Sequence, residues 1–309
     1  MGYPLFKVVK KGLYTTYQDL GRYGYQRFGV VTGGAMDTYS CQIANILVGN
    51  RRDEACLEVT MIGPELAVEA DSLLIAVCGA DLGLTVNDTP APLWRSFVVQ
   101  KGDVIRFGRP TSGVRAYLAV SGGFTIPEVL GSKSFFQKAK LGTEIAVGDV
   151  LDGIETRNYK RIGINQEWIP RFERCVTIRT ILGPHNHLFT NESIQYFLSD
   201  SYVVIQGDRM GYRLKGPTPL KHINQADIAS DAIPLGGIQV PSNGEPIILL
   251  SDRQTTGGYT RIANVISVDM YKIAQLPTGG TIQFEACTIN KAHELIHRRE
   301  QFLKALQMA

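Results

Sequence analysis

Apolar residues in this chain fall mostly in short runs, separated by turns rich in Gly, Pro, Asn and Asp. Runs of this length and spacing are typical of a β-barrel or a β-sandwich. We expect strands over Phe6–Val9, Leu57–Met61, Glu65–Glu69, Leu73–Cys78, Leu82–Val86, Ser96–Val99, Val104–Phe107, Tyr117–Val120, Cys175–Ile181, Ser201–Gln206, Ile238–Val240, Ile247–Leu250, Val265–Ser267 and Thr281–Ala286. The pattern therefore predicts a mainly β protein.

Three segments carry features of a helix instead. Asp37 is a favourable N-cap for a helix over 40–48, and Gly49-Asn50 would end it. A short helix is expected over Asn191–Leu198. The chain closes with an amphipathic segment, Asn290–Gln307, whose apolar residues lie on one helical face.

The strand pattern lapses between Asp152 and Arg174, where the sequence is polar and aperiodic. Related short sequences occur on both sides of this gap. Arg22–Gly29 and Arg209–Gly216 share the pattern Arg-x-Gly-Tyr-x-x-x-Gly, although the order of similar pieces differs between the halves. We therefore predict two similar β domains, over residues 1–155 and 175–309, and a linker over 156–174.

Composition and charge narrow the possible functions. The net charge is only +3 and no Lys/Arg block reaches five residues, so neither nucleic acid nor an anionic membrane surface is expected as a partner. No apolar window is long enough to span a bilayer, and the N-terminus lacks the pattern of a secretory signal. The five cysteines are scattered without a Cys-x-x-Cys pair, as in reduced cytoplasmic proteins.

Several motifs of catalytic or metal sites are absent or incomplete. His293–His297 matches His-Glu-x-x-His, but the few residues that follow offer no suitable third zinc ligand. His185-x-His187 has no carboxylate or cysteine in register. There is no Gly-x-x-x-x-Gly-Lys-Ser/Thr loop for ATP and no Gly-x-Ser-x-Gly nucleophile elbow. No metal site is therefore expected.

Two arginine-containing segments remain as candidates. The segment Asp19–Asp37 has two arginines, a glutamine and five glycines before a helix start, where backbone N–H groups can bind an anion or a carbonyl. A binding loop is favoured over a structural one, because Arg22 and Gln26 have no acidic partner nearby. In the second segment, Arg209 and Arg213 suit either a substrate carboxylate or acids of the protein across a surface, and both interpretations stay open.

The third candidate is Ser251–Tyr259, Ser-Asp-Arg-Gln-Thr-Thr-Gly-Gly-Tyr. It places a carboxylate, a guanidinium, an amide and two hydroxyls directly after an apolar strand. It ends in a glycine pair, which can take backbone angles that are closed to other residues. Composition alone favours a binding site and a polar hairpin about equally.

These segments occur together with further motifs in a fixed order: Gly-Arg-Tyr-Gly-Tyr-Gln (21–26), Gly-Gly-Ala-Met-Asp (33–37), Ala-Asn-Ile-Leu-Val-Gly-Asn (44–50), Leu-Glu-Val-Thr (57–60), Tyr-Leu-Ala-Val-Ser-Gly-Gly (117–123), Asp-Arg-Met-Gly-Tyr-Arg-Leu (208–214), Ile-Gln-Val-Pro (238–241) and Asp-Arg-Gln-Thr-Thr-Gly-Gly-Tyr (252–259). The series resembles the biotin-dependent carboxyltransferase/allophanate hydrolase subunit 2 family. The resemblance extends from about Phe6 to Phe284, although the sequences around 143–149 and 165–174 match nothing diagnostic.

The resemblance implies two cyclophilin-like β-barrel domains. It also implies the non-autonomous C subunit of an ATP-dependent 5-oxoprolinase, which works with an A subunit and a KipI-like B subunit to open 5-oxoproline to glutamate. Two alternatives stay open: a biotin-dependent carboxyltransferase acting on urea or another amide, and a KipA-like protein that binds a KipI-type kinase inhibitor. The chain has neither a biotin-carrier motif nor an ATP-grasp signature. ATP with Mg²⁺, or biotin, is therefore expected to act through partners.

The site residues expected from the resemblance supply groups for a planar amide and a carboxylate. The expected substrate-binding residues are Arg22, Gln26, Gly34, Arg209, Tyr212, Arg213, Gln254, Thr255, Thr256, Gly257 and Tyr259. No general base is assigned, and Asp37 and Asp252 are the candidates.

Overall fold

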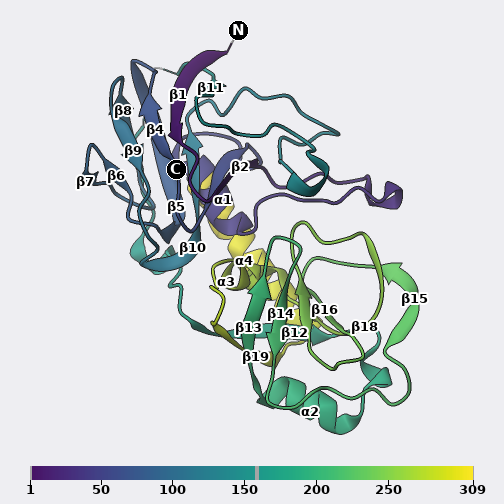
Figure 1. Cartoon of the computed structure of the whole chain (residues 1–309). Helices are drawn as coiled ribbons and strands as arrows, with labels where there is room; N and C mark the ends of the chain where they lie inside the picture. The colour runs from purple at the N-terminus through teal and green to yellow at the C-terminus, as the bar shows by residue number, and fades with distance from the viewer. Residues whose placement is uncertain (1, 157–159, 309) are drawn as a thin grey trace. The chain divides into compact units, whose positions relative to one another are not determined.

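The computed structural model describes residues 2–156 and 160–308. The chain divides into two compact units (Figure 1). The first contains Met1–Arg22, Gly33–Phe172 and Leu303–Ala309, and the second contains Tyr23–Thr32 and Glu173–Phe302. The linker predicted over 156–174 includes residues 157–159, which lie outside the described residues. The predicted domain boundaries stay predictions.

Two sheets form the first unit. Hydrogen bonds order the first sheet as β11 (Val150–Gly153), β1 (Tyr3–Lys10), β4 (Glu65–Val68), β9 (Val104–Arg106), β6 (Thr85–Val86) and β7 (Thr89–Pro90). They order the second as β2 (Tyr14–Gln18), β3 (Cys56–Thr60), β10 (Ser112–Val120), β5 (Ser72–Asp81) and β8 (Ser96–Gln100). Within each sheet the described strands pair antiparallel.

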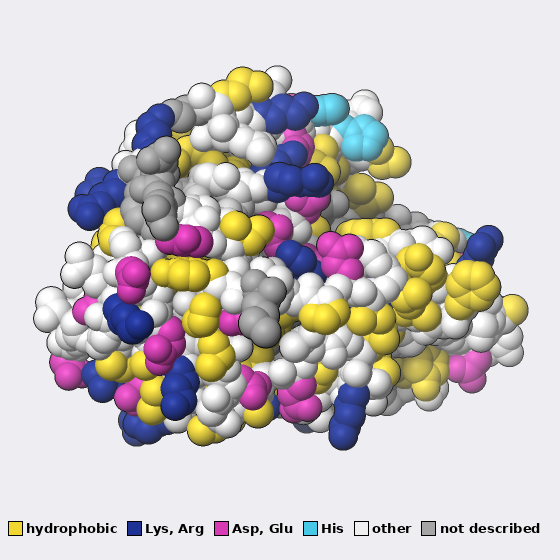
Figure 2. Space-filling view, turned by 90° about the horizontal axis from the view of Figure 1, so that it is seen from above, with side chains coloured by type: hydrophobic (Ala, Val, Ile, Leu, Met, Phe, Trp, Pro, Cys, Tyr) yellow, Lys and Arg dark blue, Asp and Glu magenta, His cyan; other side chains and the backbone are white. Residues whose placement is uncertain are grey.

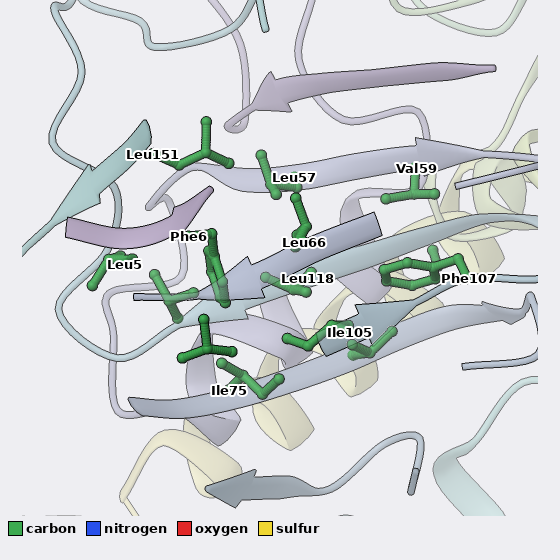
Figure 3. Packing of buried hydrophobic residues seen from close by; sticks show 14 of the residues in the cluster. Leu5, Phe6, Leu57, Val59, Leu66, Ile75, Ile105, Phe107, Leu118 and Leu151 are labelled. Atoms are coloured by element: carbon green, nitrogen blue, oxygen red, sulfur yellow. The ribbon is translucent and has the colours of Figure 1, made fainter. Parts of the chain in front are cut away.

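The core of this unit contains side chains from both sheets. Phe6 and Leu66 of the first sheet belong to one buried cluster with Leu57, Ile75 and Leu118 of the second (Figure 3). All five side chains are less than 2% exposed. Burial of a large aliphatic or aromatic side chain contributes about 1.5–3 kcal/mol, so this cluster is the main stabilising feature of the unit.

Helix α1 (Thr38–Leu47) packs on β5 and β10. The Asp37 carboxylate caps it, because it accepts a hydrogen bond from the Ser40 backbone N–H at 3.0 Å and another from the Ser40 hydroxyl at 2.6 Å. Gly49, with a φ of +80°, follows the last turn. The predicted helix, its cap and its glycine stop are confirmed.

One eight-stranded sheet forms the second unit. Its order is β12 (Cys175–Leu182), β19 (Thr281–Ala286), β13 (Ser201–Gly207), β14 (Gly211–Lys215), β17 (Ile247–Leu249), β16 (Gly237–Val240), β18 (Thr256–Val265) and β15 (Asp227–Ala232). Strand β12 also pairs with β18, so the sheet closes into a barrel and β15 lies outside the ring (Figure 1). Closure leaves β15 as the edge strand of the sheet, because its pairing is with β18 alone.

Helices α2 (Asn191–Ser199) and α3 (Met270–Ala274) belong to this unit, and α4 (Ile289–Met308) begins in it and ends in the first unit. Helix α2 places Phe197 against Phe284 of β19 with ring centroids 4.5 Å apart. The short helix α3 follows β18, and α4 ends the chain. The helices predicted over Asn191–Leu198 and Asn290–Gln307 are confirmed, whereas α3 was not predicted.

Strand β18 is the longest strand of the barrel and changes partner along its length. Its first residues pair with β15 and its last with β12. Between them, the Arg261 backbone N–H donates to His185 Nδ1 at 3.2 Å, and the Gly183 N–H donates to the Ile262 carbonyl at 2.7 Å. The His185 side chain therefore accepts a backbone hydrogen bond from β18 at the position where the partner of β18 changes from β15 to β12.

The predicted mainly β class with a few helices is confirmed, and most predicted strands are observed within a residue or two. Two were wrong. Val265–Ser267 is not a strand, because β18 ends at Val265 and a 3₁₀ turn begins at Ser267. The run Leu82–Val86 contains only the two-residue β6, since Leu82 and Leu84 are buried core residues outside any strand.

The shared Arg-x-Gly-Tyr pattern does not mark a structural repeat. The first copy leads into a 3₁₀ turn, η1 (Gln26–Phe28), and its Tyr25 is half-buried. In the second copy Gly211 begins β14, and Tyr212 is buried in the barrel. The same short sequence pattern therefore adopts two different backbone conformations, because tertiary packing determines which one forms.

Candidate functional site

The glycine pair of the Ser251–Tyr259 segment lies inside a strand. The turn occurs earlier, at Ser251 and Asp252, and β18 already begins at Thr256. Neither Gly257 nor Gly258 has a positive φ. These two glycines therefore do not use the backbone angles that are closed to other residues.

Gly257 provides space for neighbouring side chains. A Cβ at this position would lie 2.7 Å from Ile233 Cδ1, 2.9 Å from Gln239 Nε2 and 3.5 Å from Gln254 Nε2. Real Cβ atoms essentially never approach within 3.0 Å of another heavy atom. The ends of two glutamine side chains thus lie near the backbone at Gly257, where a methyl group would displace the end of Gln239 but make only ordinary contact with Gln254.

These two amides keep most of their hydrogen-bonding capacity. Gln239 is 2% exposed, and its Nε2 donates a long 3.4 Å hydrogen bond to the Tyr259 carbonyl. Within the described residues, neither polar atom of the Gln254 side chain forms a hydrogen bond, and that side chain is half-buried. An amide offers both a donor and an acceptor, so the pair suits a planar amide ligand.

Arg253 lies beside the amides and was missing from the predicted site. Its Nε donates to the Ile233 carbonyl at 3.0 Å and its Nη1 to the Leu250 carbonyl at 3.4 Å. No carboxylate in the described part of the chain pairs with it. Burial lowers the pKa of the Arg253 guanidinium, and the nearby Tyr23 phenol acts in the opposite direction. The group nevertheless remains charged, because arginine does not lose its proton in proteins.

The guanidinium groups of Arg213 and Arg261 come from the same sheet face as the Gln239 side chain. Antiparallel pairing aligns Arg213 with Ile247, Ile247 with Gln239, and Gln239 with Arg261. Directly paired residues share one face of a sheet, so these side chains form a row across four strands. The adjacent row, which includes Tyr212 and Ile248, faces the barrel core. The structure therefore places Arg213, a predicted site residue, on the face that carries the amides.

Arg261 is almost fully buried within this row. Its Nη1 donates to the Ala232 carbonyl at 2.7 Å and its Nη2 to Asp231 at 3.0 Å, while its Nε has no partner among the described residues. We call Gln239, Gln254, Arg253 and Arg261 the Gln–Arg cluster. It holds two cations but only one paired carboxylate, Asp231, which binds Arg261, so the cluster favours an anionic or strongly dipolar ligand.

Other predicted residues of this unit lie in the same segment or in its support. Thr256 and Tyr259 are exposed on β18, and the Thr255 carbonyl accepts from the Ile233 N–H at 3.0 Å. Tyr212 donates from its hydroxyl to the Leu276 carbonyl at 3.2 Å inside the barrel. Gln26 accepts from the Gly24 N–H at 3.0 Å and so closes its own turn.

Arg209 and Asp252 form an ion pair inside the protein. Nε of Arg209 donates to Oδ2 of Asp252 at 2.9 Å and Nη2 donates to Oδ1 at 3.0 Å, with both side chains buried. Of the two interpretations of Arg209, pairing with an internal acid is therefore the observed one. Asp252 remains a candidate base only if this pair opens.

The predicted residues of the first unit are all buried. The Arg22 guanidinium donates to the Val129 carbonyl at 2.8 Å and the Ser134 carbonyl at 2.9 Å. Gly34 has a φ of +87°, and a Cβ there would lie 2.8 Å from Gly21 N. Asp37 is the N-cap of α1. Arg22 thus fastens one loop of the unit, and Gly34 permits a close backbone approach.

A buried polar chain precedes α1 and was not predicted. The Asp37 N–H donates to the Tyr117 hydroxyl at 2.7 Å, and that hydroxyl donates to Glu58 Oε2 at 2.8 Å. The Met36 N–H also donates to this oxygen, at 2.8 Å. Burial, and then the carboxylates of Glu58 and Asp37, raise the pKa of Tyr117 well above its usual value. The spacing of Glu58 and Tyr117 in two predicted strands gave no sign of this contact.

Other surface features carry less information. No group of three or more His, Cys, Asp or Glu side chains in the described residues is arranged to hold a metal ion. His185 immediately precedes a 3₁₀ turn, η4 (Asn186–Leu188), and His187 lies within it, so the two are not in a strand. None of the described helices combines the length and apolar composition needed to cross a bilayer. Charges of both signs are interspersed over the face in Figure 2.

Comparison with known proteins gives matches over nearly the whole chain. The family model described as "Carboxyltransferase domain, subdomain A and B" matches residues 28–286. The C subunit of the 5-oxoprolinase of Escherichia coli (strain K12) is 34% identical, over 98% of this chain and 97% of that protein. The protein of the same name from Haemophilus influenzae is 35% identical, over 94% of each.

A solved structure matches the fold closely. The urea amidolyase of K. lactis superposes with a TM-score of 0.93 and 30% identity over 99% of this chain. This chain spans only 20% of that protein. The same fold therefore occurs both as a separate chain and as part of a much longer one.

Proposed function

Because the chain belongs to the carboxyltransferase domain family of subdomains A and B, we propose that it is the C subunit of a 5-oxoprolinase. The observation that carries this proposal is the match to two proteins of that name along 94–97% of their length. A shared fold alone would not suffice, since one fold serves many functions. Similarity along a whole chain of the same length is the stronger argument.

The Gln–Arg cluster supports the proposal chemically. A lactam presents a carbonyl oxygen and an N–H in one plane. The amides of Gln239 and Gln254 supply donors and acceptors above Gly257, where their Nε2 atoms converge. Donors fixed at the carbonyl oxygen also stabilise negative charge that develops there as a lactam ring opens. We assign lactam recognition to these two amides.

Partners complete the activity in this proposal. We assign the use of ATP with Mg²⁺ to the assembly with the A and B subunits, since the chain has no phosphate-binding Gly-x-x-x-x-Gly-Lys-Ser/Thr loop. The test is reconstitution of the three purified proteins, with glutamate release from 5-oxoproline measured in the presence of ATP. Turnover should require this chain. Equal turnover in its absence would refute the proposal.

A second candidate is biotin-dependent carboxyl transfer to a small amide. The similarity to the K. lactis urea amidolyase favours it. Under this alternative, activity would need a biotinylated carrier, and avidin would abolish it. Turnover of 5-oxoproline that is insensitive to avidin would count for the role in a 5-oxoprolinase and against the alternative.

A further inference from the structure

We infer that Arg253 makes this protein selective for a carboxylated amide over a neutral one. The inference rests on the proposed function and identifies the residue that distinguishes the ligands. An arginine side chain has five N–H donors. In the described structure Arg253 uses two of them, one at Nε for the Ile233 carbonyl and one at Nη1 for the Leu250 carbonyl.

The three remaining N–H donors belong to Nη1 and Nη2, the two nitrogens of one guanidinium edge. The two carbonyls hold the guanidinium in place, so little rotamer freedom is left to lose when a ligand binds. A carboxylate accepts two parallel hydrogen bonds from such an edge. The geometry of Arg253 is thus that of an anchored cation with one side available.

Burial of Arg253 increases the effect of its positive charge on ligand binding. Arg253 is half-buried and its pKa is lowered by that burial, which means that the charged form is partly desolvated. A desolvated cation without a counter-charge is unfavourable, and the usual remedy is a paired acid. Asp252, its neighbour in sequence, is bound to Arg209 instead. A ligand carboxylate would supply the missing charge.

The position of Arg253 suits a ligand held by the amides. Its Nε binds the carbonyl of Ile233, whose Cδ1 lies over Gly257 together with Gln239 and Gln254. A single residue, Ile233, therefore links the Arg253 guanidinium to the two glutamine amides. Urea carries no charge and would gain nothing from the cation.

The test compares Arg253→Gln, Arg253→Lys and wild type in the reconstituted complex. We expect Arg253→Gln to raise the KM for 5-oxoproline about 10–100-fold with a smaller change in kcat, the size of effect that follows loss of a charged hydrogen bond. Arg253→Lys should lie between, because it keeps the charge but not the paired donors. Lys215→Gln, which removes an exposed charge on β14, is the matched control.

A second readout is independent of turnover. The full chain is titrated with 5-oxoproline and with 2-pyrrolidinone, which has the lactam but no carboxylate, and binding is followed by ligand-observed NMR. Wild type should prefer 5-oxoproline and Arg253→Gln should lose the preference. An unchanged KM in the active Arg253→Gln complex would overturn the inference while the proposed function stands. If the reconstituted Arg253→Gln complex shows no turnover, its KM cannot be measured. Equal binding of 5-oxoproline and 2-pyrrolidinone to the wild-type chain would then overturn the inference.

Discussion

Arg209 and Asp252 are 43 positions apart in sequence and form a buried ion pair with two hydrogen bonds, at 2.9 and 3.0 Å. The Asp252 N–H also donates to the Arg209 carbonyl at 2.8 Å. Two loops of the barrel are thereby fixed to each other at the start of the Ser251–Tyr259 segment. The pair positions Arg253 and Gln254, which follow directly in the chain.

Removal of one member of this pair should strongly destabilise the protein. Asp252→Ala leaves the Arg209 cation buried without its counter-charge, and we expect a loss of about 3–5 kcal/mol in the free energy of unfolding. The double variant Arg209→Met/Asp252→Leu should recover most of that loss, because it leaves no buried charge. Urea unfolding of the three proteins measures both effects. A double variant as unstable as Asp252→Ala would contradict the explanation.

Gly257→Ala should disturb the cluster far more than Gly258→Ala. Both glycines lie in β18 without a positive φ, so the added methyl group differs mainly in what it meets. At Gly257 it would press on Ile233 and Gln239, whereas at Gly258 the nearest atom is the Ile228 carbonyl oxygen at 3.3 Å. We expect Gly257→Ala to displace the ends of these two side chains at little cost in stability and to lower turnover of the complex more than Gly258→Ala does. Similar behaviour of the two variants would refute the spatial argument.

Gln254→Ala should weaken ligand binding without weakening the fold. Its amide has no partner in the described residues, so truncation breaks no internal hydrogen bond. Loss of one or two neutral hydrogen bonds to a lactam should raise the KM about 3–10-fold. Gln225→Ala, at an exposed glutamine in the same unit, is the control and should match wild type. A normal KM in Gln254→Ala would remove this residue from the site.

Substitutions at Asp37 distinguish its role as the helix N-cap from any role of its negative charge. Asp37→Ala should cost about 1 kcal/mol or more, because the Ser40 N–H loses its acceptor. Asp37→Asn keeps an oxygen for that bond and should retain most of the stability. Thermal unfolding gives the comparison. Turnover that falls in the stable Asn variant would indicate a catalytic role for the carboxylate, and equal instability of both variants would contradict the capping argument.

The stability of the protein should decrease in mild acid, in part through His185. Its Nδ1 accepts from the Arg261 N–H and must be unprotonated to do so. Burial, followed by the charge of Arg261, lowers the pKa of His185. The unfolded chain then binds a proton more readily, so this contribution is present above about pH 6.5 and is lost as the pH falls toward the folded pKa.

The measurement is the urea midpoint at about pH 7.5 and about pH 5.5. Wild type should lose more stability over this interval than His185→Gln does. His222, whose pKa is also lowered by burial, contributes with the same sign in both proteins. His297→Gln, on the exposed side of α4, should behave as wild type. An identical pH dependence in His185→Gln would exclude the proposed role of this histidine.

Local sequence determined much of the architecture. Short apolar runs identified most strands, because alternation and turn residues act over a few neighbouring positions. Asp37 predicted the start of α1 for the same reason, since a cap and its helix are adjacent. The resemblance to a carboxyltransferase family also rested on sequence alone, through ordered motifs. Gln254 and Gly257 belong to one motif, so the sequence alone could group them as candidates.

Tertiary structure decided which polar residues are available to a ligand. The sequence offered Arg22, Arg209 and Arg213 as binding groups and passed over Arg253. In the fold, Arg22 binds backbone carbonyls, Arg209 binds Asp252, and Arg253 has no acid among the described residues. Gln239 reaches the site from another strand, so no local pattern could include it. Pairing between distant residues depends on how strands align in space, and adjacency in sequence does not specify it.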